Sequence, residues 1–119
     1  MRRGIEMRES ALYKQIQMAV TAIGHRLFRN NVGTLKNQRG EYVTYGLCEG
    51  SSDLIGWKTI RIQPWHIGMN IAQFVAIEVK MPGKKATEKQ QNFIEAVKQA
   101  GGIATVCCST EEALNAIQR

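Results

Sequence analysis

Glu78 and Lys80 stand two residues apart at the end of residues 74–80, a run whose composition predicts a central, buried strand. Side chains alternate along a strand, so both charges project from the same face. Burying a carboxylate beside an ammonium costs free energy unless the pair faces water or takes part in chemistry. The pair is therefore either a solvent-facing salt bridge at a strand end or part of a reactive site.

A second acid favours the reactive site. Asp53 follows turn residues 50–52 and opens another apolar run, so Asp53, Glu78 and Lys80 converge if the two strands pair. Two carboxylates suffice to hold Mg²⁺ or Mn²⁺, because water and a substrate phosphate complete the shell; the backbone carbonyl of Val79 can add a ligand. Such an ion activates water against a phosphodiester, and Lys80 can stabilise the developing charge. This pattern predicts metal-dependent phosphodiester hydrolysis.

Composition limits the alternatives. The chain has 119 residues, 44% hydrophobic and 22% charged, which predicts a single globular domain over 1–119. A formal net charge of +6 and a pI near 9.5 favour a polyanionic partner such as DNA. No apolar run is long enough for a membrane span, and charges interrupt the first residues where a signal peptide would lie. We expect no membrane partner and no organic cofactor.

The three cysteines, Cys48, Cys107 and Cys108, form no CxxC pair, which argues against a disulfide framework or a zinc site. A reduced, cytoplasmic setting is the simplest expectation. Cys107 and Cys108 are adjacent in an apolar strand, so one of them should point into the core.

The first helix should position one further acid. Apolar residues recur at steps of three and four over residues 8–27, which predicts an amphipathic helix. Glu9 extends the apolar stripe with a carboxylate. Alternatively, Ser10 caps the helix and leaves Glu9 just outside it.

The remaining elements complete an α/β fold. Strands are expected over 42–47, 53–58, 73–80 and 103–108, with an exposed loop or hairpin tip over 34–41 and an irregular excursion over 58–72. Helices should begin at the capping boxes of Thr87 and Ser109, and the first of them should stop at Gly101. The order helix, three strands, helix, strand, helix predicts a mixed central sheet flanked by helices, with the strands on either side of the Thr87 helix parallel.

Two sets of polar residues have both a structural and a functional interpretation. Gln90 completes the capping box of Thr87, yet it lies on the apolar face of the same helix, where it can reach the site. Several basic or polar residues either contact DNA phosphates or form solvated turns, namely Arg29, Asn30, Lys36, Arg39, Lys84 and Lys85.

The acids and the lysine resemble the signature of the PD-(D/E)XK nuclease superfamily. Five segments in order resemble, more particularly, the VRR-NUC family in its stand-alone phage and prophage form. The segments are Arg29-Asn30-Asn31-Val32-Gly33, Gly50-Ser51-Ser52-Asp53-Leu54-Ile55-Gly56, Ala76-Ile77-Glu78-Val79-Lys80, Thr87 with Gln90 and Phe93, and Gly101-Gly102-Ile103-Ala104. The E-x-K motif alone is weak, whereas the ordered set, from about Glu9 to Val106, is strong. Ser52 stands where the superfamily name has proline.

The resemblance implies a restriction-endonuclease-like core and Mg²⁺- or Mn²⁺-dependent cleavage of branched DNA, such as a four-way Holliday junction. It implies catalytic roles for Glu9, Asp53, Glu78, Lys80 and Gln90, with Asp53, Glu78 and the Val79 carbonyl as metal ligands. It further implies a homodimer, encoded by a phage or prophage and acting in DNA repair. The alternatives are a non-catalytic module of the same fold that binds structured DNA, and a flap or restriction-type nuclease.

Overall fold

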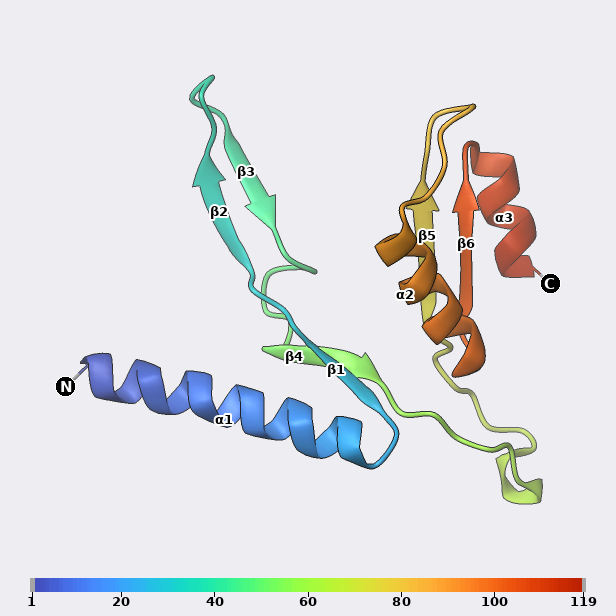
Figure 1. The fold of residues 1–119 in the computed structure, drawn as a ribbon, viewed down its shortest axis with the longest axis horizontal. Helices are drawn as coiled ribbons and strands as arrows, with labels where there is room; N and C mark the ends of the chain where they lie inside the picture. The colour runs from blue at the N-terminus through green and yellow to red at the C-terminus, as the bar shows by residue number, and fades with distance from the viewer. Residues whose placement is uncertain (1, 119) are drawn as a thin grey trace. The chain divides into compact units, whose positions relative to one another are not determined.

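The computed structural model describes residues 2–118, with side chains from residue 9 onward, and has a small mixed α/β fold (Figure 1). The chain divides into two compact units between Lys58 and Thr59. None of the described helices is long and apolar enough to cross a membrane. The expectation of a single domain over 1–119 stays a prediction.

The first unit contains one helix and four short strands. In chain order these are α1 (Arg2–Ala22), β1 (Arg26–Arg29), β2 (Gly33–Lys36), β3 (Tyr42–Tyr45) and β4 (Leu54–Trp57). Antiparallel pairing joins β1 to β4 and, separately, β2 to β3, and α1 packs against β1. Gly56 lies opposite Leu27 so closely that any side chain at this position would collide with the Arg26 carbonyl. The close approach of β1 and β4 therefore requires glycine here.

The second unit is a parallel strand pair with two helices. It comprises the 3₁₀ helix η1 (Pro64–His66), β5 (Val75–Val79), α2 (Glu88–Gln99), β6 (Ile103–Cys107) and α3 (Thr110–Gln118). Both α2 and α3 pack on β6, and α2 also contacts β5 (Figure 1). Val97, Ala104 and Cys107 are buried in its small core, whereas Cys108 is exposed. The prediction that one of the two adjacent cysteines points inward is confirmed.

Several predicted elements agree with the structure within a few residues. The four expected strands correspond to β3, β4, β5 and β6, and β5 and β6 are parallel as expected. Thr87 caps α2 through its side chain, which accepts a hydrogen bond from the Gln90 N–H, and the helix ends before Gly101. The Ser109 Oγ likewise accepts from the Glu112 N–H at 3.1 Å, at the start of α3.

The region after α1 differs from the prediction. The first helix was expected to continue to Leu27, but it ends at Ala22, because Gly24 adopts a positive φ of 93°. The N–H groups of Gly24 and His25 then bond back to the Thr21 and Val20 carbonyls, which is the pattern of a glycine-terminated helix. Glu9 and Ser10 both lie inside α1, so the alternative in which Ser10 caps the helix is wrong.

The strands β1 and β2 were not predicted. Their pairing with β4 and β3 accounts for this, because short strands that carry arginine, glycine and lysine have weak intrinsic preference and form through their partners. Residues 34–41 were expected as a loop or hairpin tip, and they include most of β2 and the tip of the β2–β3 hairpin. The described strands form three two-stranded sheets, where the sequence predicted one mixed central sheet.

Candidate active site

In the second unit, the charged pair at the end of β5 lies on one face of the strand as predicted. The Lys80 Nζ is 3.5 Å from the Glu78 Oε1. The Lys80 side chain is 23% exposed and the Glu78 side chain is 31% exposed, so the pair is half-buried and differs from a salt bridge fully in solvent. The Lys80 N–H donates to the Cys107 carbonyl at 3.0 Å, which extends the β5–β6 pairing as far as the lysine and fixes its backbone.

Gln90 combines the two roles that the sequence left open. Its side-chain carbonyl accepts a hydrogen bond from the Thr87 N–H at 2.9 Å, which closes the capping box of α2. Its side-chain amide donates to the Glu78 Oε1, also at 2.9 Å. The start of α2 is thereby linked to the carboxylate of β5, and the cap that begins the helix also orients the acid.

Both contacts of the Glu78 carboxylate fall on the same oxygen. Lys80 and Gln90 meet Oε1, so among the described residues of the second unit the other oxygen, Oε2, has no hydrogen bond or ion pair. A carboxylate held by one oxygen keeps the other for a ligand, and ligating carboxylates in metal sites are themselves hydrogen-bonded in this way. The Glu78 carboxylate is thus held in one orientation, and its Oε2 is available to bind a ligand.

A pocket of about 370 Å³ opens beside this carboxylate within the second unit. Its walls come from β5 and α2, with apolar side chains and two polar groups besides Glu78; the lining residues are Ala76, Ile77, Glu78, Lys89, Gln90, Phe93 and Ile94. The carboxylate therefore faces a cavity that also contains an exposed lysine from α2.

In the first unit, Asp53 sits at the end of a loop that Asn30 holds in place. The Asn30 amide donates to the Ser51 Oγ at 2.7 Å and to the Ser52 carbonyl at 2.9 Å, while its Oδ1 accepts from the Leu47 N–H at 3.0 Å. The Asn30 N–H also donates to the Asp53 carbonyl at 2.8 Å. Asn30, directly after β1, therefore fastens the loop over residues 47–53 at three points.

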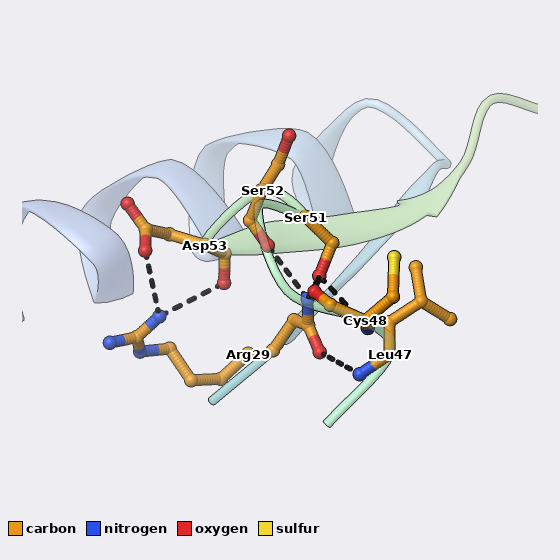
Figure 2. A network of polar contacts seen from close by, with 7 residues as sticks. Arg29, Leu47, Cys48, Ser51, Ser52 and Asp53 are labelled. Carbon is orange, nitrogen blue, oxygen red and sulfur yellow. Dashed lines mark hydrogen bonds and ion pairs between the residues drawn. The ribbon is translucent and has the colours of Figure 1, made fainter. Parts of the chain in front are cut away.

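The Asp53 side chain is 66% exposed, so packing does little to fix it. Its carboxylate instead meets Arg29, whose Nη1 is 3.7 Å from Oδ1 and also donates to the Asp53 carbonyl at 3.0 Å (Figure 2). Tyr13 of α1 completes the cluster: its ring centroid lies 4.1 Å from the Arg29 Cζ, and the Asp53 carboxylate acts on its hydroxyl.

The charges around Tyr13 act on its hydroxyl. Partial burial is the largest effect that raises the pKa of Tyr13, followed by the interaction with the Asp53 carboxylate and the negative charge of Glu9; Arg29 lowers it. A tyrosine hydroxyl is protonated near neutral pH, so it can donate toward the carboxylate. Glu9 lies one helical turn before Tyr13, which brings this acid to the same face of α1.

The metal ligands predicted from the sequence belong to different units. Asp53 lies in the first, and Glu78 with the Val79 carbonyl lies in the second, so their convergence stays a prediction. Within the described part of the chain, no group of three or more His, Cys, Asp or Glu side chains is gathered. The donor types nevertheless suit a hard divalent cation, because all are oxygens and Glu78 has an unengaged one.

The residues predicted to bind DNA lie in varied surroundings. Lys36 and Arg39 are exposed on the β2–β3 hairpin and its tip, and Lys84 and Lys85 are exposed in the turn between β5 and α2. Arg29 and Asn30, in contrast, contact the Asp53 loop. DNA contacts by all six stay predictions.

Two residues that contact the Asp53 cluster, Tyr13 and Ser51, were not predicted from the sequence. A signal for Tyr13 was present, because it lies four residues after Glu9 and therefore on the same helix face. Ser51 donates to the Cys48 carbonyl at 2.6 Å within its own loop and accepts from Asn30, which lies 21 residues away and is not revealed by the sequence pattern.

Comparison with known proteins identifies the family. The family profile described as the VRR-NUC domain matches residues 8–111. No curated protein and no solved structure matched significantly. The matched region contains both the Asp53 loop and the Glu78–Lys80 strand end, and it covers most of the chain. The chain therefore belongs to the VRR-NUC family, a family of nuclease domains that act on DNA.

Proposed function

We propose that this protein is a Mg²⁺- or Mn²⁺-dependent endonuclease that hydrolyses phosphodiester bonds in branched DNA, in the manner of a Holliday-junction resolvase. The observation that carries the proposal is the environment of Glu78. Lys80 and Gln90 hold one carboxylate oxygen, and the other remains available beside a pocket. This arrangement suits a carboxylate that ligates a metal next to a phosphate.

Each residue then has a separate task. Glu78 and Asp53 bind the cation, with Glu9 and the Val79 carbonyl as further oxygen donors. A bound Mg²⁺ would supply Lewis-acid stabilisation of the phosphate and a more acidic water. Lys80, held by its ion pair and its backbone hydrogen bond, places a positive charge where charge develops as the bond breaks. Gln90 keeps the Glu78 carboxylate oriented through its amide.

Charge and symmetry support the choice of substrate. The net charge of +6 and the exposed lysines and arginine of the hairpin and the β5–α2 turn favour a polyanion. A four-way junction is resolved by two nearly symmetric nicks, which a two-fold homodimer with one site per chain would deliver. We propose such a dimer, of the stand-alone phage type.

A substrate panel tests the activity. The chain is incubated with four-way-junction, flap and linear duplex DNA in Mg²⁺, in Mn²⁺ and in EDTA. The proposal expects nicking of the junction in either metal and none in EDTA. Preferential cleavage of flaps would instead assign a flap nuclease, and junction binding without nicking in any metal would assign a non-catalytic DNA-binding module.

Two variants make the panel specific to the site. Lys80→Ala should lower turnover while Mn²⁺ binding measured without DNA changes little, and Lys98→Ala, an exposed lysine at the end of α2, is the matched control. Light scattering with and without junction DNA tests the dimer. A monomer at micromolar concentration in both conditions contradicts two-fold assembly.

A further inference from the structure

One face of α1 carries a polar stripe that points to β1 and the Asp53 loop. Its members, Glu9, Tyr13 and Gln17, are spaced by four residues and therefore lie above one another on the helix. Gln17 donates to the Leu27 carbonyl at 3.2 Å, which fixes this face against β1. Tyr13 is half-buried in the middle of the stripe, one turn from each neighbour. The Gln17 contact thus keeps the face of α1 that carries Tyr13 against β1.

The ring and the hydroxyl of Tyr13 have different partners. The ring lies under the Arg29 guanidinium, with 4.1 Å between the Arg29 Cζ and the ring centroid, which is a cation–π contact. The Asp53 carboxylate acts on the hydroxyl and raises its pKa, and Arg29 itself approaches the same carboxylate at 3.7 Å. Tyr13 therefore contacts Arg29, which in turn contacts Asp53, within the first unit.

We propose that Tyr13 is a positioning residue that pre-orients the Asp53 carboxylate for a divalent cation. Asp53 lies on a loop with a largely exposed side chain, so only polar contacts restrict its rotamers. The hydroxyl restricts the carboxylate directly, and the ring does so through Arg29. The inference rests on the proposed function, because it assigns Asp53 the role of a metal ligand.

The two contacts of Tyr13 can be separated by one substitution. Tyr13→Phe keeps the ring under Arg29 and removes only the donor to Asp53. Tyr42→Phe is the matched control, because Tyr42 is an exposed strand residue whose ring lies 5.9 Å from the Lys36 Nζ, so the same hydroxyl is removed beside a similar cation. Asp53→Asn shows how far Mn²⁺ affinity falls when the ligand itself is lost.

The test is calorimetric titration of the full chain with Mn²⁺ in the absence of DNA, together with thermal unfolding. Outer-shell substitutions typically weaken metal binding by about 10–100-fold, so Tyr13→Phe should raise the Mn²⁺ dissociation constant about tenfold. The unfolding temperature should match that of Tyr42→Phe. Saturating Mn²⁺ should restore junction cleavage in Tyr13→Phe but not in Asp53→Asn, because the ligand is misplaced in one variant and absent in the other.

Three results overturn the inference, and they are distinguishable. An unchanged Mn²⁺ dissociation constant in Tyr13→Phe, with a clear loss in Asp53→Asn, refutes the positioning role and leaves the proposed function intact. Absence of Mn²⁺ binding in the unaltered chain refutes both. A fall in unfolding temperature with no change in Mn²⁺ affinity identifies Tyr13 as a packing residue only.

Discussion

The two units position their candidate acids by different means. In the second unit, Glu78 belongs to a regular strand, and its partners come from the same strand and from the capping box of the next helix. In the first unit, Asp53 follows a loop whose shape depends on Asn30, 23 residues earlier. Its carboxylate meets Arg29 of β1, which in turn packs on Tyr13 of α1. Local secondary structure orients one acid, and long-range side-chain contacts orient the other.

This difference has a physical consequence for mutational sensitivity. A strand and a helix cap are each supported by many backbone hydrogen bonds, so one lost side chain changes their geometry little. The loop before Asp53 is held by a few side-chain contacts, most of them from Asn30, and has fewer supporting hydrogen bonds to replace a lost one. Substitutions around Asp53 should therefore impair metal binding and cleavage by altering the shape of the loop. Substitutions around Glu78 should impair them by altering the local charge.

Removal of either acid should have the largest effect on cleavage. Glu78→Gln and Asp53→Asn should each lower metal-dependent junction cleavage by more than about 100-fold, because outer-shell changes alone cost about 10–100-fold. Both variants should remain folded by circular dichroism. Initial cleavage rates measure the effect, with Glu95→Gln, an exposed acid on α2, as the control. Full activity in either variant would remove that acid from the site.

Gln90→Glu separates the cap from the site in the second unit. Glutamate also closes a capping box, so the start of α2 should be retained, but the donor to Glu78 becomes a second carboxylate. Cleavage should fall about 10–100-fold as for other outer-shell changes.

Thr87→Ala is the complement to Gln90→Glu. It removes the cap and should lower the free energy of unfolding by about 0.5–2 kcal/mol, with little change in cleavage under conditions where the protein is folded. Urea unfolding and initial rates measure the two effects. Equal losses of activity in both variants would mean that the cap, and not the contact to Glu78, matters.

Asn30→Ala tests the loop of the first unit. It removes three side-chain hydrogen bonds and should lower the free energy of unfolding by about 1 kcal/mol or more while also weakening Mn²⁺ binding through Asp53. Asn31→Ala, at an exposed neighbouring asparagine, is the control. Weaker DNA binding with unchanged stability and unchanged Mn²⁺ affinity would instead support the DNA-contact role predicted from the sequence.

The smallest effect concerns the start of α3. The Cys108 thiol lies 2.9 Å from the Glu112 Oε1, and this hydrogen bond is the main cause that raises the pKa of Cys108 and lowers the pKa of Glu112. The contact stabilises the fold while the carboxylate is ionised and the thiol is neutral. Its contribution is lost as the pH falls through the Glu112 pKa or rises through the Cys108 pKa.

Alkylation kinetics measure this contact. Because the thiolate is the reactive form, Glu112→Gln should lower the Cys108 pKa and accelerate its alkylation severalfold near pH 8. Glu111→Gln is the control, and the exposed Cys48 is replaced by serine in all variants. Equal rates in the two glutamine variants would show that Glu112 does not govern the thiol.

Local patterns predicted the elements whose signals lie within a few residues. The Thr87 capping box, the glycine stop of α2 and the same-face placement of Glu78 and Lys80 follow from spacing alone, since helix caps and strand alternation depend on near neighbours. The E-x-K pair, the Asp53 turn and the ordered motifs also sufficed to indicate the nuclease family.

Only the tertiary structure decided how the polar groups are connected. It showed that β1 and β2 form through their partners, that one oxygen of Glu78 takes both contacts, and that Asn30, Arg29 and Tyr13 converge on the Asp53 loop. These contacts join residues from different segments, so no local spacing encodes them. Their geometry arises when strand pairing and helix packing bring those segments together.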